Sequence, residues 1–244
     1  MTCPRGGDHA PRRVVAAGGG MNLGPYLLGP NDTPENGIYT GDARELAKAI
    51  PDESIDLIFT DPVYDRIDDY KWLAETGARV LKDRKSVLAF CPHVMFDAAI
   101  GFRDAGLRLN PLLDHAPNGS CGTMWVYKLQ MNGIPCLWAS KGNPDNAFQM
   151  LRFYGAHLSG LRGFKWAKNP HFIAYRLEKY TAVDALTFDP FAGGGTVPAV
   201  CKMLNRKYLA FEIDPDVAQM ARDRVRHTQP PLPIEMHEQL EMGV

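Results

Sequence analysis

The sequence lacks the features that would place the chain in a membrane or in an oxidising compartment. No apolar run approaches the roughly 20 residues of a membrane span, and no apolar stretch follows the arginines near the N-terminus. The five cysteines are scattered and contain no Cys-x-x-C pair, which argues against a disulfide framework or a zinc site. We therefore expect a cytoplasmic protein with no membrane partner and no bound metal.

Net charge is also nearly absent, because 27 Lys and Arg residues balance 28 Asp and Glu residues to a formal charge of −1. This balance excludes a basic nucleic-acid coat, an acidic tail protein and a disordered chain. The charge is nevertheless uneven: residues 115–180 contain eight basic side chains against two acidic ones, so this segment carries +6 and the remainder −7. Aromatic residues lie among these cations. The pattern is typical of phosphate contact and base stacking, and also of a solvated helix face above a core strand.

The chain divides into one α/β domain and two extensions. Residues 1–36 are rich in Gly, Pro, Asn and Asp and are interpreted as a flexible arm, and residues 229–244 hold three prolines and form a C-terminal extension. Between them, over 37–228, short apolar runs alternate with amphipathic segments, which indicates a mainly parallel sheet with helices on both faces. Strands are expected at 38–39, 55–60, 86–90, 124–127, 135–139, 185–188 and 207–213. Helices are expected at 43–50, 70–81, 93–105, 146–158, 171–180, 197–204 and 216–227.

A glycine-rich turn follows the apolar strand at 185–188. It reads Asp189-Pro-Phe-Ala-Gly-Gly-Gly-Thr196 and leads directly into a helix. Glycines at a strand-to-helix turn allow close approach of a ligand, and Glu212 at the end of the next strand is placed to bind ribose hydroxyls. The turn lacks the spacing of a dinucleotide or triphosphate loop, so a ligand with a ribose and a small charged tail fits better. A turn that only packs helix on strand is the alternative.

An acidic turn follows the strand at 55–60 and reads Asp61-Pro62-Val63-Tyr64. A carboxylate at the carboxyl end of a parallel strand points into the crevice where such folds bind ligands. An acid, a carbonyl and an aromatic ring this close together suit a planar group that bears an amino substituent. The alternative is an Asp that caps the next helix, with Tyr64 in the core.

These two motifs together resemble those of the amino-directed DNA methyltransferases, the N-4 cytosine and N-6 adenine family. The tetrad 61–64 is similar to their Asp-Pro-Pro-Tyr motif, and 189–196 is similar to their cofactor loop. The segment 211–214 matches the one that carries the acid for the cofactor ribose. The tetrad comes first, as in the circularly permuted beta class, and Gly41-Asp42-Ala43-Arg44 and Lys168-Asn169-Pro170 resemble two further elements. The resemblance covers residues 41–225. It implies a Rossmann-like S-adenosylmethionine-dependent methyltransferase fold with a mixed seven-stranded sheet in permuted order.

The resemblance also implies a mechanism in which an adenine or cytosine is flipped out of double-stranded DNA. The Asp61 carboxylate and the Pro62 carbonyl hold the amino hydrogens, and Tyr64 stacks on the base. S-adenosyl-L-methionine is the implied cofactor. Its implied contacts are Asp189 and the backbone of Gly193 to Gly195 at the methionine end, Thr196 and Lys168 at its carboxylate, Glu212 at the ribose, Asp42 at the adenine amino group, and Phe191 by packing. A core role for Phe191 and a solvated surface position for Lys168 are the alternatives.

Two departures from the family pattern affect these expectations. Val63 replaces the second proline, which loosens the turn, and Asn169 interrupts the Lys-Pro pair and weakens the case for Lys168. Asp rather than Ser at the head of the tetrad favours N6 of adenine over N4 of cytosine. Target recognition is expected in a short insert near 142–166, and a short or relaxed site, or a homodimer, would suit so small an insert. The expected DNA-binding residues are Lys141, Arg152, Arg162, Lys165 and Trp166.

Three other functions stay open at this point. The first is an N4-cytosine DNA methyltransferase. The second is an amino-group methyltransferase that acts on RNA or protein, although such families usually place the cofactor loop before the tetrad. The third is a non-catalytic, methyltransferase-like DNA-binding subunit, against which the intact Asp61, Pro62, Tyr64 and Glu212 argue.

Overall fold

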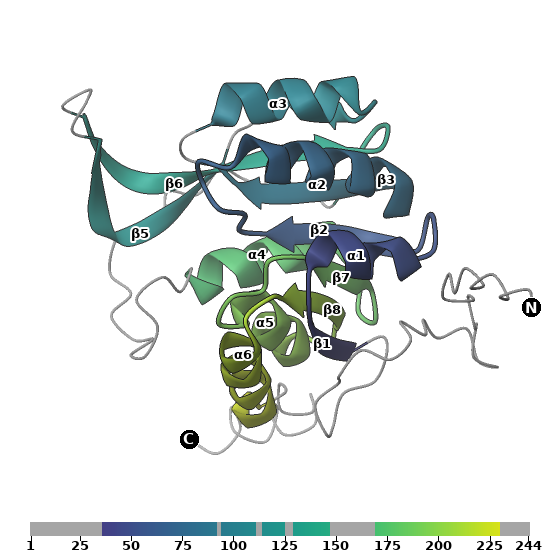
Figure 1. The fold of residues 1–244 in the computed structure, drawn as a ribbon, viewed down its shortest axis with the longest axis vertical. Helices are drawn as coiled ribbons and strands as arrows, with labels where there is room; N and C mark the ends of the chain where they lie inside the picture. The colour runs from purple at the N-terminus through teal and green to yellow at the C-terminus, as the bar shows by residue number, and fades with distance from the viewer. Residues whose placement is uncertain (1–35, 92–93, 111–113, 125–128, 147–168, 230–244) are drawn as a thin grey trace, which may run out of the picture.

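A computed structural model describes residues 36–91, 94–110, 114–124, 129–146 and 169–229 (Figure 1). The expected arm, apart from Asn36, and the expected C-terminal extension, apart from Gln229, lie outside these residues. So does the helix that the sequence predicts at 146–158, apart from its first residue.

One mixed sheet of eight strands forms the centre of the fold. The bounds are Asn36–Thr40 for β1, Ile55–Thr60 for β2, Leu81–Phe90 for β3, Arg108–Leu109 for β4, Asp114–Met124 for β5, Leu129–Ser140 for β6, Leu186–Asp189 for β7 and Lys207–Glu212 for β8. Seven strands follow the order β1-β8-β7-β2-β3-β6-β4, and β5 pairs with β6 outside this path. The first five strands of the path run parallel, and β6 is antiparallel to its three neighbours. The predicted Rossmann-like α/β fold with a mixed sheet is confirmed.

Helices cover both faces of this sheet (Figure 1). Their bounds are Ala43–Leu46 for α1 with the 3-10 turn η1 at Ala47–Ala49, Ile67–Val80 for α2, Met95–Asp104 for α3, Pro170–Tyr180 for α4, Thr196–Met203 for α5 and Pro215–His227 for α6. Leu73 of α2 and Phe102 of α3 belong to one buried cluster, whereas Leu177 of α4 and Val225 of α6 belong to a second. In the part of the chain that the structure describes, none of these helices is long and apolar enough to cross a membrane.

Strand β2 separates the two clusters, which explains the apolar run from Leu57 to Phe59 at its centre. Ile58 packs into the cluster beneath α1, α2 and α3, while Leu57 and Phe59 pack into the cluster beneath α4, α5 and α6. Because side chains alternate across a strand, a strand covered on both faces carries apolar residues at consecutive positions. Each of these side chains is fully buried, and each contributes about 1.5–3 kcal/mol relative to an exposed position.

Capping residues fix where the helices begin. The side chains of Asn169 and Asp214 accept hydrogen bonds from the first backbone N–H groups of α4 and α6, and proline follows each of them at the first helical position. Asp42 caps α1 in the same way. Such caps stabilise a helix by about 1 kcal/mol. Two of them, Asp42 and Asp214, stand two residues after the strands β1 and β8, so they also turn the chain sharply at the sheet edge.

The edge of the sheet beyond β3 differs from the sequence-based expectation. Of the predicted strand at 124–127 only Met124 is described, and it is the last residue of β5. The predicted strand at 135–139 lies within β6, which pairs antiparallel with β5, and the two-residue strand β4 was not predicted. The sequence of β5, DHAPNGSCGTM, contains proline, glycine and polar residues that are depleted in strands. Pairing with β6 therefore overrides the local propensity of this segment.

The crossovers leave the sheet in opposite directions between β2 and β7. From β7 the chain passes through α5 to β8 on one side, whereas from β2 it passes through α2 to β3 on the other side. The two crossover helices lie on opposite faces (Figure 1). Ligands of doubly wound sheets bind at the carboxyl ends of the strands beside such a switch point. The fold therefore makes the turns after β2 and β7 the expected place for a ligand.

Gly195 holds the turn after β7 tightly against α6. Its φ is +72°, in the left-handed region, and a Cβ added there would lie 2.8 Å from the Cβ of Ala221 in α6. Two features therefore require glycine at this position: the left-handed backbone conformation and the close approach of helix α6.

The substitution Gly195→Ala is expected to lower the free energy of unfolding by at least about 2 kcal/mol, because a left-handed backbone and overpacking both oppose a side chain. Urea denaturation measures the loss. Gly106→Ala is the matched control: its φ is +86°, but an added Cβ would meet nothing within 4 Å. We expect that variant to lose only about 1–2 kcal/mol. Equal losses in the two variants would contradict the packing role of Gly195.

Candidate active site

Four strand ends bring the predicted site residues to one edge of the sheet. Asp61 follows β2, Asp189 ends β7, Glu212 ends β8, and Asp42 comes two residues after β1. These strands are parallel neighbours, with Ile58 opposite Phe188 of β7 and with Asp189 and Thr40 both paired to β8. The carboxylates that stand far apart in the sequence therefore share the carboxyl edge beside the switch point.

Asp189 is buried where β7 and β2 meet. One oxygen, Oδ1, accepts hydrogen bonds from Thr60 Oγ1 at 2.7 Å and from the backbone N–H of Phe191 at 3.2 Å. Burial raises the pKa of Asp189 to about 7; the nearby Asp61 and Glu212 carboxylates add to the rise, and the two hydrogen bonds oppose it. Asp189 therefore joins the two halves of the site and titrates near neutral pH.

Glu212 fixes the glycine turn to the end of β8. Its Oε2 accepts a hydrogen bond from Gly193 N–H at 2.8 Å, and its Oε1 accepts one from Asp214 N–H at 3.0 Å. Its backbone carbonyl accepts a bond from Gly41 N–H at 2.9 Å, which ties the end of β1 to the same point. Each carboxylate oxygen can accept a second hydrogen bond, and Glu212 is only partly buried. The side chain can therefore bind hydroxyl groups of a ligand while it holds the turn.

The tetrad forms a compact turn after β2. Pro62 is buried, whereas the Val63 side chain is 49% exposed and its carbonyl accepts a hydrogen bond from Arg66 N–H at 3.2 Å. Burial raises the pKa of Tyr64 above its usual value, and the charge of Asp61 and a hydrogen bond to its carboxylate add to this rise. Tyr64 is therefore neutral and close to Asp61. The valine that replaces the second proline faces solvent, away from these groups.

The other predicted cofactor contacts lie at the same edge, each with a partner of its own. Asp42 accepts a hydrogen bond from Arg44 N–H at 2.8 Å. Phe191 packs edge-on against Trp72, with ring centroids 5.8 Å apart, so its ring contacts helix α2. Thr196 begins α5, and its hydroxyl accepts a hydrogen bond from a neighbouring arginine side chain.

Sequence reasoning missed two side chains at this edge. Arg224 of α6 donates to the hydroxyl of Thr196 at 2.8 Å, and burial lowers its pKa. Tyr70 of α2 is fully buried and donates to the carbonyl of Phe90 at 2.8 Å, and burial raises its pKa. Both partners are distant in sequence, so no local pattern marks either residue. The one available signal for Arg224 is its position on the helix after the acidic end of β8.

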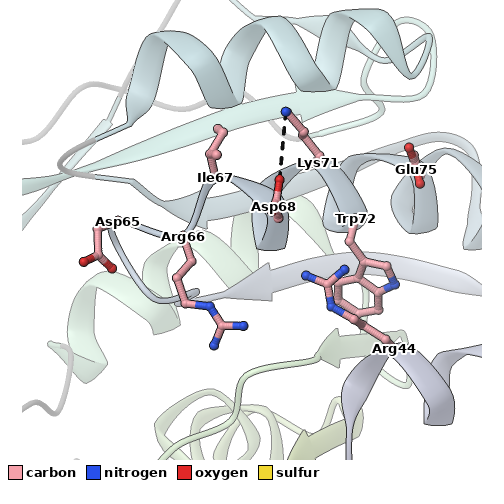
Figure 2. Close-up of a pocket in the computed structure, with 8 residues that line it drawn as sticks. All are labelled: Arg44, Asp65, Arg66, Ile67, Asp68, Lys71, Trp72 and Glu75. Carbon is pink, nitrogen blue, oxygen red and sulfur yellow. Dashed lines mark ion pairs between the residues drawn. The ribbon is translucent and has the colours of Figure 1, made fainter.

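A pocket of about 630 Å³ opens beside the tetrad turn (Figure 2). The turn, the start of α2 and the first turn of α1 line it with Arg44, Asp65, Arg66, Ile67, Asp68, Lys71, Trp72 and Glu75. Since Trp72 contacts Phe191, the pocket adjoins the glycine turn as well. Basic and acidic side chains alternate along this lining, and the sequence analysis named none of them as functional. Among the described residues, no group of three His, Cys, Asp or Glu side chains could hold a metal ion.

Lys141 does not join the site. It lies beside the first residues of β3, where its Nζ is 3.0 Å from Glu53 Oε1 and 3.1 Å from the Leu81 carbonyl oxygen. This is the amino edge of the parallel strands, opposite the edge that carries Asp61. Lys141 therefore lies apart from the tetrad, and its role as a DNA contact stays a prediction. The other predicted cations and the aromatic residue lie outside the described residues: Arg152, Arg162, Lys165, Trp166 and Lys168.

Comparison with known proteins shows which family this chain resembles. Residues 118–223 match the profile of the N6_N4_Mtase family, described as DNA methylase. Over 260 aligned residues the chain is 26% identical to the type II methyltransferase M.HinfI of Haemophilus influenzae, covering 80% of this chain and 69% of that protein. It is 24% identical to M.HpaI of Haemophilus parainfluenzae, over 77% and 73% of the two chains. These matches support an amino-directed DNA methyltransferase.

Solved structures share the fold of this DNA methyltransferase. The M1.HpyAVI–SAM complex superposes with a TM-score of 0.65 at 22% identity and covers 77% of this chain and 98% of its own. The cytosine-N4-specific PvuII DNA methyltransferase gives a TM-score of 0.66 at 18% identity, over 86% and 92% of the chains. The cofactor of the family is S-adenosylmethionine, as predicted. The site fits it: a Cβ at Gly193 would meet nothing within 4 Å, so the turn leaves space there, and Glu212 can accept ribose hydroxyls beside it.

The raised pKa of Asp189 predicts a pH dependence of stability. Below the unfolded pKa of about 4 both states are protonated, and between about 4 and 7 only the folded state holds the proton. The free energy of unfolding is therefore expected to fall as pH rises from 5 to about 7 and then to level off. Urea denaturation at several pH values tests this. In Asp189→Asn, whose side-chain oxygen still accepts from Thr60, the fall should be smaller. An unchanged pH profile in that variant would refute the assignment.

Proposed function

We propose that this DNA methyltransferase transfers a methyl group to N6 of adenine in double-stranded DNA. The observation that carries the proposal is the arrangement of Asp61, Asp189 and Glu212 at the ends of the adjacent strands β2, β7 and β8. A single ligand that spans these strand ends contacts Glu212, the proposed ribose-binding acid, at one end and the tetrad at the other. The aspartate at the head of the tetrad favours adenine over cytosine.

On the substrate side, the tetrad has to orient an amino group of low nucleophilicity. The amine lone pair is delocalised into the base, so no covalent intermediate is needed and positioning supplies most of the catalysis. We assign the Asp61 carboxylate and the Pro62 carbonyl as the acceptors of the two amino hydrogens, and Asp61 as the group that faces the departing proton. Tyr64 stacks on the flipped base. Stacking of about 1–3 kcal/mol offsets much of the cost of flipping.

On the cofactor side, the turn and the strand ends bind a zwitterionic nucleoside. S-adenosylmethionine supplies a methyl group activated by its sulfonium centre. Glu212 accepts the ribose hydroxyls, Asp42 the adenine amino group, and Asp189 with the Gly193 and Gly195 backbone borders the methionine end. Thr196 takes the carboxylate, and the half-buried Arg224 that donates to its hydroxyl adds positive charge there.

The order of the elements supports a permuted arrangement of this family. The tetrad strand β2 comes before the cofactor strand β7, with β5 and β6 between them. We propose a single methyltransferase domain at 37–228, with the recognition insert near 142–166 between β6 and α4. The arm, the C-terminal extension, the DNA contacts within the insert, the cytoplasmic location and the homodimer stay predictions.

The test is transfer of tritiated methyl groups from S-adenosylmethionine to DNA, with RNA and protein as parallel acceptors. We expect label in DNA, and we expect Asp61→Ala to lower the rate at least about 1000-fold while cofactor affinity survives, because acceptor positioning is lost. Glu212→Gln should instead weaken cofactor affinity by about 10- to 100-fold, because it loses charge-assisted hydrogen bonds. Asp97→Ala, which removes an exposed charge of α3, is the control and should match the wild type.

Hydrolysis of the labelled DNA to nucleosides identifies the accepting base in the same experiment. We expect N6-methyl-2′-deoxyadenosine. Label in N4-methyl-2′-deoxycytidine would overturn the adenine assignment and leave the rest of the proposal intact. Label in RNA or protein alone, or full activity of Asp61→Ala, would overturn the proposed function itself.

A further inference from the structure

A buried carboxylate beside the tetrad holds two arginines at once. The Asp69 side chain is 3% exposed, and its Oδ1 lies 2.7 Å from Arg44 Nη2 while its Oδ2 lies 3.3 Å from Arg66 Nε. An unpaired carboxylate at this depth would cost several kcal/mol, so the two guanidinium groups stabilise it. Asp69 thereby joins α1, which carries Arg44, to the turn that carries the tetrad.

The two arginines are not equivalent. Arg44 lies over the Trp72 ring at 5.7 Å and places a terminal nitrogen on Asp69, so its charge is largely engaged. Arg66 is 62% exposed, and its Nε lies 3.3 Å from Asp69 Oδ2 in an ion pair without hydrogen-bond geometry. Among the described residues the Arg66 guanidinium makes no hydrogen bond. A guanidinium group has five N–H donors, so Arg66 can hold Asp69 and an outer anion together.

The acidic side chains of the pocket do not occupy this outer position. In Figure 2, Arg66 and Arg44 extend toward the same side of the pocket, whereas Asp65 points away from them. Asp68 lies on the other side of the helix start and pairs with Lys71 at 3.9 Å. Neither Asp65 nor Asp68 therefore covers the outer face of Arg66.

Arg66 also belongs to the turn that carries the tetrad. It follows Tyr64 by two residues, and its backbone N–H bonds to the Val63 carbonyl at 3.2 Å, inside the turn that presents Asp61. A base held by Asp61 and Tyr64 carries its sugar and the flanking phosphates to the mouth of the same turn. Phosphate oxygens are the commonest targets of arginine in DNA complexes.

We propose that Arg66, held in place by Asp69, contacts a backbone phosphate of the flipped nucleotide. The inference rests on the proposed function, because it needs a base in the tetrad. It adds a DNA contact on the catalytic turn, outside the basic segment 115–180 that the sequence marked for DNA. The buried Asp69 orients the guanidinium before DNA arrives, which lowers the ordering cost of binding.

The salt dependence of DNA affinity tests this contact. Each phosphate contact contributes about 0.9 to the slope of log Kd against log salt concentration. Arg66→Ala is therefore expected to make the slope less steep by about 1 and to weaken DNA binding, on unmethylated duplex DNA with S-adenosylhomocysteine present. Arg66→Lys, which keeps a point charge, should retain most of the slope. Arg44→Ala is the matched control, since it removes the same charge from the same carboxylate, and its slope should equal that of the wild type.

Three results would overturn the inference. These are an unchanged slope in Arg66→Ala, an equal reduction in Arg44→Ala, or a loss of cofactor affinity in Arg66→Ala without a change in slope, which would place the arginine at the cofactor instead. Methyl transfer by the wild-type protein is recorded alongside. Label in DNA with an unchanged slope rejects the Arg66 contact alone, whereas no label in DNA rejects the proposed function.

Discussion

The hydrogen bond between Thr60 and Asp189 joins strand β2 to strand β7 just beyond their last paired residues, where both strands end. The paired register of β2 and β7 ends at Ile58 and Phe188, so the side chains of Thr60 and Asp189 continue the contact beyond it. The next residue after Thr60 is Asp61, the proposed acceptor of the amino hydrogens, and the glycine turn begins just after Asp189. One buried bond therefore sets the distance between the proposed acceptor of the base and the proposed cradle of the cofactor.

The same constraint explains the unusual titration of the site. Asp189 has to be buried to make this bond, and burial raises its pKa even though two hydrogen bonds oppose the rise. Glu212 and Asp61 add negative charge nearby. A positively charged cofactor suits such a place, because it compensates several carboxylates that repel one another. The raised pKa of Asp189 thus depends on the burial that the fold imposes as well as on the carboxylates of the two motifs.

Much of this could be predicted from the sequence, because the signals are local. The apolar strand before Asp61, the glycines after Asp189 and the acid at Glu212 each mark a strand end, and parallel strands bring such ends together. The contacts of Asp69 and Arg224 were not predictable, since their partners lie on other elements. Strand β5 was not predicted for a different reason. Its proline and glycines disfavour strands, and the segment is extended because it pairs with β6.

The central claim is that one ligand spans the strand ends from Glu212 to Asp61. A crystal structure of the protein with S-adenosylhomocysteine tests it most directly. The account predicts that the ribose hydroxyls bond to Glu212, that the adenine amino group faces Asp42, and that the sulfur lies on the side of Asp61. A nucleoside bound away from Glu212, or a sulfur turned away from Asp61, would contradict it.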